Sequence, residues 1–269
     1  MMSDLAALIL GVVEGFTEFL PISSTAHLIL ASRLLGVAQS EFAKTFEIAI
    51  QSGAILAVVV LYWRKFLDWD VLKKVAAAFV PTGIIGLAAY SFVKNYLLED
   101  ISVVLWALGI GGALLIIFER WKRRVSINAA AGAPSGASVA LPTAGEAITY
   151  KKAVGIGVFQ AVAVIPGVSR AAATIVGGML LGIGRAQIVE FSFLLAVPTM
   201  LAATGLDLVR NANAFSSSEV GTLAIGMVVS FLAATLSIKF LLRYIKTHDF
   251  TGFGIYRILL ALLFLLLFT

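Results

Sequence analysis

The chain has 269 residues, of which 60% are hydrophobic and 13% are charged, and its mean hydropathy is +1.01. So little polar surface cannot coat a soluble globule of this size, and the runs 101–118 and 221–231 contain no charged residue. The net charge of +5 does not indicate nucleic-acid binding, because the basic residues form short clusters beside apolar segments. The sequence therefore predicts an all-α polytopic membrane protein. The absence of cysteine excludes disulfides, thiolate metal sites and cysteine nucleophiles.

The first predicted element is an apolar region, 5–35, that Pro21 breaks near its middle. No basic stretch precedes this region, so we expect no cleaved signal peptide. A second region, 153–181, is broken in the same way by Pro166. Polar residues crowd at both breaks, and each half is too short to span a bilayer. We expect two re-entrant helical hairpins, because irregular backbone persists at membrane depth only where protein or a wet cavity satisfies it.

Three transmembrane helices are predicted after each hairpin. The six predicted spans are 42–62, 75–93, 101–118, 188–209, 220–242 and 254–268. Residues 125–149, rich in Ala, Gly, Ser and Pro, predict a flexible cytoplasmic linker. This linker divides a single membrane domain, 1–269, into halves at 1–124 and 150–269.

Charge predicts the orientation of these spans. Lys and Arg follow the first, third and fifth spans, whereas the opposite loops are mainly acidic. Because basic loops stay in the cytoplasm, both termini and the open end of the first hairpin should face outward. We also expect Arg185 to pair with Glu190 at a helix start on the cytoplasmic side.

The two halves resemble each other. Residues 11–24 and 157–170 share a pattern of Gly, Pro and Ser when one residue is skipped, and both continue to Leu-Leu-Gly. An odd number of spans separates the hairpins, so the second hairpin enters from the opposite face. This predicts an inverted-topology repeat whose two broken helices meet near the membrane midplane.

Acidic and nucleophilic residues surround the first break. Glu14 and Glu18 are four residues apart, which places two carboxylates on one helix face. An ionisable group at the membrane centre costs at least about 2.5 kcal/mol and normally marks a site. Ser24 and His27 follow within the same break and are candidates for a nucleophile or a proton-transfer group. The alternatives are a solvated glutamate pair near the outer surface and a purely structural histidine.

The second break predicts an anion site. Arg170 lies at membrane depth with no acidic neighbour in sequence, and Gly167 permits a tight turn into the following helix. The guanidinium, the helix N-terminal amides and the hydroxyls of Ser169 and Thr174 can hold a phosphate. The alternative is a salt bridge from Arg170 to Glu14 or Glu18. The phosphate site and the salt bridge are compatible if the carboxylates bind a divalent cation or activate water.

These motifs resemble the undecaprenyl-diphosphate phosphatases, also described as bacitracin-resistance proteins. The similarity rests on the glutamate-rich segment 14–27, the Pro-Gly-x-Ser-Arg element 166–170, and the segments 44–47, 190–198 and 256–257. It covers nearly the whole chain apart from the linker.

The resemblance implies hydrolysis of undecaprenyl diphosphate to undecaprenyl phosphate and inorganic phosphate, which recycles the lipid carrier for cell-wall synthesis and confers bacitracin resistance. It also implies a divalent cation, Mg²⁺ or Ca²⁺, and a homodimer. The location implied is the bacterial inner (cytoplasmic) membrane, with the active site open to the periplasmic side.

Carried over by position, the resemblance implies three sets of site residues. The catalytic set is Glu14, Glu18, Ser24, His27 and Arg170, the phosphate-binding set is Gly167, Ser169, Arg170 and Thr174, and the metal-binding set is Glu14 and Glu18. Attack by Ser24, by His27 or by an activated water all fit these residues. The chief alternative function is a lipid or small-molecule transporter or flippase, since inverted repeats are a transporter plan.

Overall fold

The fold is entirely helical in the part of the chain that the structure describes, which confirms the predicted all-α class. The computed structural model describes residues 2–37, 41–97, 100–131, 147–210 and 219–268. The ten α-helices are α1 (Asp4–Thr17), α2 (Ser24–Leu34), α3 (Glu41–Tyr62), α4 (Trp69–Phe92), α5 (Ile101–Ala131), α6 (Tyr150–Ala161), α7 (Arg170–Leu180), α8 (Arg185–Arg210), α9 (Val220–Tyr244) and α10 (Thr251–Phe268). Two 3₁₀ turns, η1 (Lys65–Leu67) and η3 (Val162–Val164), and one π-helical turn, η2 (Val93–Leu97), complete the described elements.

Within the described ranges, five helices are long and apolar enough to cross a membrane, as expected of a multi-pass membrane protein. The qualifying segments are Thr45–Tyr62, Trp69–Tyr90, Ile101–Val125, Arg185–Leu206 and Val220–Tyr244. They correspond to the first five predicted spans, and the sixth falls on α10, an apolar helix of 18 residues. Trp106 on α5 is 64% exposed and Leu266 on α10 is 81% exposed. Outward faces that carry such side chains suit contact with lipid.

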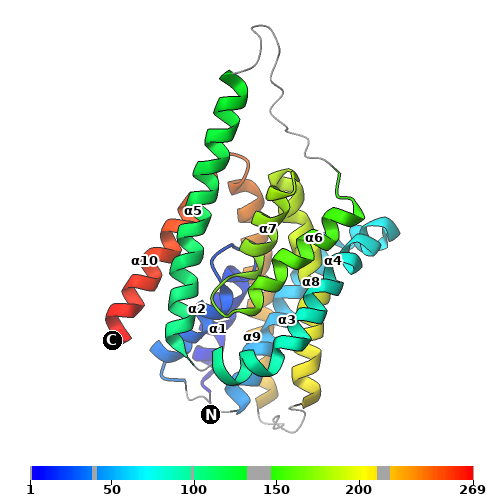
Figure 1. The fold of residues 1–269 in the computed structure, drawn as a ribbon. Helices are drawn as coiled ribbons and strands as arrows, with labels where there is room; N and C mark the ends of the chain where they lie inside the picture. The colour runs from blue at the N-terminus through cyan, green and yellow to red at the C-terminus, as the bar shows by residue number, and fades with distance from the viewer. Residues whose placement is uncertain (1, 38–40, 98–99, 132–146, 211–218, 269) are drawn as a thin grey trace.

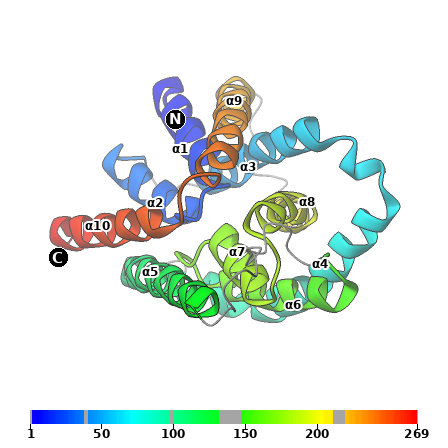
Figure 2. The same cartoon turned by 90° about the horizontal axis from the view of Figure 1, so that it is seen from above.

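The two halves of the chain interlock in one bundle (Figure 1). Helix α1 packs along α9, α6 along α4, α3 along both α8 and α9, and α5 along α10. Each of these pairs joins a helix from before the linker with a helix from after it. Figure 2 shows α5 and α10 side by side at one edge of the bundle.

Small residues bring the two broken segments close to full-length helices. A Cβ on Gly15 of α1 would lie 2.2 Å from the Ser230 carbonyl oxygen of α9. A Cβ on Gly157 of α6 would lie 1.9 Å from the Ala78 carbonyl oxygen of α4. Only glycine allows backbones to approach this closely, which is how membrane helices gain packing contact. Both broken segments are thereby fixed inside the bundle.

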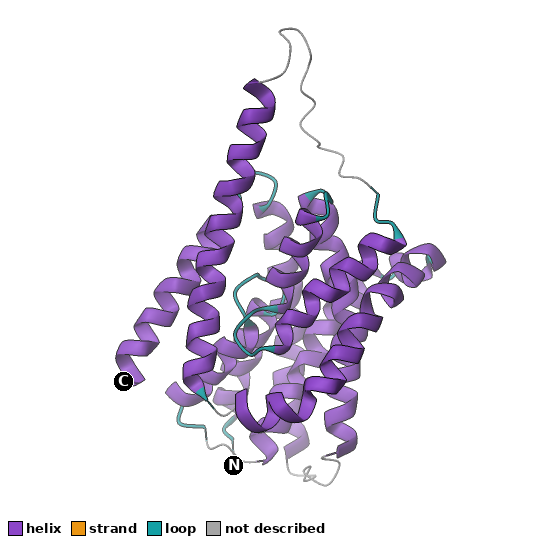
Figure 3. Ribbon diagram, viewed as in Figure 1, coloured by secondary structure: helices purple, strands orange, loops and turns teal. Residues whose placement is uncertain are grey.

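The backbone of the chain breaks at both predicted places, and the breaks share one unusual conformation. Loops interrupt the helices in the middle of the bundle (Figure 3), between Thr17 and Ser24 and between Val164 and Arg170. Ser23 has φ 72° and Ser169 has φ 76°, and they are the only non-glycine residues with positive φ in the described part of the chain. A left-handed serine costs about 1–3 kcal/mol, so the surrounding structure must hold both residues in place.

Two predictions need correction. Helix α5 continues to Ala131, so residues 125–131 are helical and not linker, while 132–146 lie outside the described residues. Arg185 does not pair with Glu190, because residues five apart on a helix do not share a face. Its Nη2 instead donates to both carboxylate oxygens of Glu119 on α5, at 2.8 and 2.7 Å.

The charged residues of the helix ends separate as predicted. The C-terminal ends of α3, α5 and α9 lie at one end of the bundle, and both chain termini lie near the other (Figure 1). Basic residues lie near or just after these C-terminal ends, or in the first two turns of α4 and α6; they include Arg64, Lys65, Lys73, Lys74, Arg120, Arg123, Arg124, Lys151, Lys152, Arg243 and Lys246. This asymmetry is the feature from which membrane orientation is inferred.

Candidate active site

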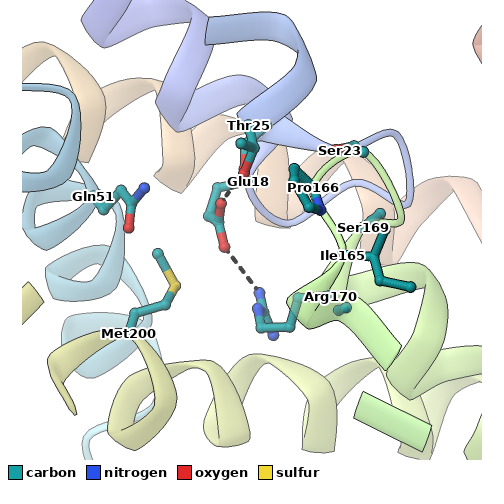
Figure 4. Close-up of a pocket in the computed structure, with 12 residues that line it drawn as sticks. Glu18, Ser23, Thr25, Gln51, Ile165, Pro166, Ser169, Arg170 and Met200 are labelled. Atoms are coloured by element: carbon teal, nitrogen blue, oxygen red, sulfur yellow. Dashed lines mark hydrogen bonds and ion pairs between the residues drawn. The ribbon is translucent and has the colours of Figure 1, made fainter. Parts of the chain in front are cut away.

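A polar cavity of about 150 Å³ lies where the two broken segments meet (Figure 4). Its lining residues are Glu18, Ser23, Ser24 and Thr25 from the first break, Ala163, Ile165, Pro166, Gly167, Ser169 and Arg170 from the second, Gln51 from α3 and Met200 from α8. Five predicted site residues are therefore brought together: Glu18, Ser24, Gly167, Ser169 and Arg170. The expectation that the two breaks converge on one pocket is confirmed.

Arg170 carries the positive charge of this cavity. It is the first residue of α7, and its Nη2 donates to Glu18 Oε1 at 3.3 Å (Figure 4). Its Nη1 donates to the Ser192 carbonyl oxygen at 2.9 Å, and the guanidinium lies 5.9 Å from the ring centroid of Phe19. The buried Nε has no hydrogen-bond partner. The predicted salt bridge to a glutamate exists, and the guanidinium keeps donor capacity for a further anion.

Glu18 joins the cationic and nucleophilic sides of the cavity. Its side chain is 7% exposed, and Oε2 accepts a short hydrogen bond from the Ser24 hydroxyl. A hydroxyl that donates to a carboxylate is paired with a group able to take its proton. Glu18, Ser24 and Arg170 thus form a connected set of carboxylate, hydroxyl and cation in the lining of the cavity.

Glu14 lies one helical turn before Glu18 and is fully buried. Neither of its carboxylate oxygens has a hydrogen-bond partner, and it is not among the residues that line the cavity. A buried carboxyl group without a partner is costly, so an unpaired one points to a proton or a cation that completes it. The predicted placement of the two glutamates on one face of α1 is confirmed by the Glu18 amide, which donates to the Glu14 carbonyl oxygen at 2.9 Å.

The second break forms the turn that the sequence predicts. Gly167 has φ +94°, and a Cβ at this position would lie 2.5 Å from the Val104 carbonyl oxygen. Ser169 caps α7, with its hydroxyl oxygen accepting from the Ala172 amide at 3.2 Å. The start of α7 therefore lines the cavity through Ser169 and Arg170. Such a helix start favours an anion.

His27 and Thr174 lie outside the cavity lining. His27 Nδ1 lies 2.7 Å from the Ser23 carbonyl oxygen, and Nε2 lies 2.8 Å from the Tyr256 hydroxyl. A carbonyl only accepts, so in the neutral ring Nδ1 donates and Nε2 accepts from the tyrosine. The Thr174 hydroxyl lies 2.7 Å from the Arg170 carbonyl oxygen and 3.2 Å from Gln160 Oε1. The structure thus gives these two residues contacts that support the breaks.

Arg257 is a further functional candidate, which the sequence motifs include only in the family-like segment 256–257. It is fully buried, and its donors reach five backbone carbonyls. The accepting carbonyls are those of Leu108, Pro21, Val168, Ala107 and Gly167, at 3.1, 3.3, 3.1, 3.2 and 2.9 Å. One side chain therefore fastens both breaks to α5. An arginine within an apolar span is itself the signal that identifies such a residue.

Comparison with known proteins assigns the family. Residues 7–263 match the family of the bacitracin resistance protein BacA. The chain belongs to this family. The undecaprenyl-diphosphatase of Sulfurihydrogenibium sp. is 48% identical over 267 residues, covering 98% of this chain and 99% of that protein. The enzymes of the same name from Aquifex aeolicus and Wolinella succinogenes are 45% and 46% identical, with 98% and 96% of each chain covered.

The metal predicted for this BacA-family protein needs ligands beyond its own acidic side chains. Within the described residues, no group of three or more His, Asp and Glu side chains could hold a metal ion. The residues nevertheless fit a partial site, because Glu14 has two unpartnered oxygens one turn from Glu18. Mg²⁺ commonly binds one or two carboxylates together with phosphate oxygens of a substrate.

Proposed function

We propose that this protein hydrolyses undecaprenyl diphosphate to undecaprenyl phosphate and inorganic phosphate. The observation that carries the proposal is the connected set of Ser24, Glu18 and Arg170 in a cavity inside a membrane bundle. A hydroxyl that donates to a carboxylate, next to a guanidinium bound to the same carboxylate, suits phosphoryl transfer. Relatives that match nearly the whole chain are named undecaprenyl-diphosphatases. Release of the lipid carrier in this way accounts for bacitracin resistance, the property for which the family is named.

In the proposed first step, Ser24 attacks the terminal phosphorus and its proton passes to Glu18. The bond between that phosphorus and the bridging oxygen breaks, and its electron pair leaves with the lipid monophosphate. Water then attacks the phosphoserine, Glu18 returns a proton to the serine oxygen, and inorganic phosphate is released. Among the three nucleophiles that the sequence leaves open, the geometry favours Ser24, because its hydroxyl donates to Glu18 and lines the cavity.

Arg170 and the start of α7 have the role of holding the phosphate. Without substrate, Nη2 of Arg170 donates to Glu18 Oε1 at 3.3 Å. An incoming diphosphate competes for that donor with a higher charge, which leaves Glu18 free to take the serine proton. Charge that builds up in the transition state is met by the guanidinium and by the hydroxyl of Ser169, both fixed before the reaction begins.

We further propose that Glu14 and Glu18 hold a divalent cation, Mg²⁺ or Ca²⁺, together with the substrate phosphates. Two unpartnered carboxylate oxygens on Glu14 support this site. A bound cation would neutralise phosphate charge and lower the barrier to departure of the monophosphate. His27 and Thr174 have supporting roles in this scheme, as their hydrogen bonds to the Ser23 and Arg170 carbonyl oxygens indicate.

We infer that the two sets of five helices form an inverted repeat with re-entrant hairpins. Helix α1 packs on α9 as α6 packs on α4, and each break ends in a left-handed serine before its second helix. Basic residues at the end opposite the termini favour an active site open to the periplasm of a bacterial inner membrane. The homodimer implied by the family stays a prediction. The relatives named above are phosphatases, which gives no support to the transporter alternative.

Acid-quench trapping tests the proposal. Purified protein in detergent is mixed with undecaprenyl diphosphate labelled on its terminal phosphate, and bound label is measured together with release of phosphate. We expect release of phosphate and acid-stable label on Ser24. Acid-labile label, or full activity of Ser24→Ala, would contradict the assigned nucleophile.

Ser32→Ala is the matched control for this experiment. Ser32 also donates to a glutamate, the half-buried Glu47, at 2.5 Å, but does not line the cavity. It should keep both phosphate release and trapped label. Absence of phosphate release by the wild-type protein from any isoprenoid diphosphate would overturn the function itself.

A further inference from the structure

A second cavity, apolar and larger than the first, opens beside the candidate active site. It has a volume of about 400 Å³ and lies between α4 with its π-helical turn η2 and α6 with its 3₁₀ turn η3. Among the described side chains that line it, none is charged or polar, and six of them are Ile85, Ala89, Phe92, Val158, Val162 and Ile165. We call this cavity the apolar groove. Its volume falls in the range of about 300–1,000 Å³ that is typical of small-molecule sites.

The apolar groove and the polar cavity share one wall. Ile165 lines both, and along the preceding turn Ala163 lines the polar cavity whereas Val162 and Val164 line the groove. Alternate residues of one short segment therefore face two different environments. In Figure 4, Ile165 lies on the same loop as Pro166 and Ser169, next to Arg170. A molecule with a charged head and an apolar tail can reach both cavities across Ile165.

The groove is open on its outer side. Phe92 is 58% exposed, Val158 and Val162 are each 52% exposed, and Ile85 is 41% exposed. On α4 the groove residues are spaced by four and three positions, which places them on one helix face. Val158 on α6 and Val162, the first residue of η3, are four positions apart, which is about one turn. In a membrane this opening meets lipid chains and not water.

Hydrogen bonds hold helices α4 and α6 together next to the groove. The hydroxyl of Thr82 donates to the Gly157 carbonyl oxygen at 2.8 Å, and Gln160 donates to Thr82 at 3.1 Å. These buried bonds fix the pair one turn or less from Val158 and Ile85. The groove therefore has a fixed wall and needs no rearrangement of α4 or α6 to exist.

We propose that the apolar groove binds the isoprenoid chain of the substrate while its diphosphate occupies the polar cavity. This inference rests on the proposed function and deepens it. The groove supplies the binding contacts for the isoprene units next to the diphosphate, and Ile165 marks the point at which head and tail divide. The lipid thus reaches the site sideways from the bilayer. Chain length then sets KM, while the groups of the polar cavity set kcat.

Chain-length kinetics with groove variants test this inference. Val158→Trp fills the groove, and Val162→Asn keeps its space but removes apolar contact. Phosphate release is measured with farnesyl diphosphate, which has three isoprene units, and with isopentenyl diphosphate, which has one. The quantity compared is kcat/KM for farnesyl diphosphate divided by kcat/KM for isopentenyl diphosphate. We expect each variant to lower this ratio at least tenfold, because KM for the longer substrate rises while kcat stays unchanged.

Val154→Trp is the matched control. Val154 lies one turn before Val158 on the same helix, is 43% exposed, and does not line the groove. It should keep the wild-type ratio. An unchanged ratio in both groove variants, or an equal fall in Val154→Trp, overturns the groove while the wild-type release of phosphate still supports the phosphatase. Absence of release from every diphosphate by the wild type instead overturns the proposed function.

Discussion

Glu18 and Arg170 lie in different halves of the chain, yet Glu18 Oε1 accepts from Arg170 Nη2 at 3.3 Å inside the polar cavity. The pair joins the two broken segments. Glu18 also accepts from Ser24, so the proposed base contacts both the guanidinium and the proposed nucleophile before any substrate binds. The contact therefore combines a structural link with the two charges that the proposed phosphoryl transfer uses.

Arg170→Ala should lower kcat for phosphate release by about 10²–10³-fold, the effect of removing one preorganised donor to a developing charge. Arg170→Lys should recover only part of this loss, since lysine cannot donate in a planar fork. The test is the rate of phosphate release by both variants and the wild type in detergent. Arg123→Ala, which removes an exposed arginine that pairs with Asp249, is the control and should retain activity. Wild-type kcat in Arg170→Ala would contradict the assigned role.

Glu14→Gln should separate stability from activity. The substitution keeps the shape of a buried side chain that has no hydrogen-bond partner but removes its charge. We expect the melting temperature to stay the same or rise, since an unpaired buried carboxylate is costly. The concentration of Mg²⁺ or Ca²⁺ required for half-maximal phosphate release should increase about tenfold, because carboxylate ligands set the affinity of such a site.

The measurement is a titration with each cation after treatment with a chelator, alongside thermal unfolding. Glu47→Gln is the comparison variant, because Glu47 already accepts a hydrogen bond from Ser32. It should leave the cation dependence unchanged. A wild-type cation requirement in Glu14→Gln would remove Glu14 from the metal site.

Much of this architecture follows from local patterns in the sequence. The breaks at Pro21 and Pro166, the shared helix face of the two glutamates and the glycine turn at 167 all depend on neighbours within a few residues. The convergence of the two breaks was expected from the similarity of the two halves, and residues of both breaks line one cavity. These features are set by residue spacing, which a single sequence displays.

The remaining contacts depend on which distant helices touch. Arg185 binds Glu119, 66 positions away, and its sequence neighbour Glu190 does not compete for it. Arg257 reaches carbonyls in three separate segments, and no pattern near residue 257 names them. His27 likewise contacts the Ser23 carbonyl oxygen in its own segment and the hydroxyl of Tyr256, which comes from the other half of the chain. Side-chain partners of this kind are decided by packing, which spacing alone does not encode.

Gly167→Ala should abolish activity through backbone geometry. Gly167 has φ +94°, and a Cβ there would lie 2.5 Å from the Val104 carbonyl oxygen. The turn must shift, and Arg170 with it. Gly36→Ala is a matched control, because Gly36 also has a positive φ, of 62°, but open space around it. It should keep near wild-type phosphate release, and equal losses in the two variants would show that strain alone explains the effect.

Arg257 gives the last prediction, because one glycine makes its role testable without touching the arginine. Arg257→Ala should lower the free energy of unfolding by about 3–5 kcal/mol, since buried carbonyls at both breaks lose their donor. A Cβ on Gly111 would lie 2.1 Å from Arg257 Nη2, so Gly111→Ala should displace the guanidinium and lower both the melting temperature and kcat in the same way.

Gly109→Ala adds the same methyl group to the same helix, but its Cβ would lie 3.6 Å from Ala261 Cβ, an ordinary contact. Thermal unfolding and phosphate release of the three variants, compared in detergent, should group Gly111→Ala with Arg257→Ala and leave Gly109→Ala near wild type. If Gly111→Ala and Gly109→Ala behave alike, the guanidinium does not hold the two breaks against α5.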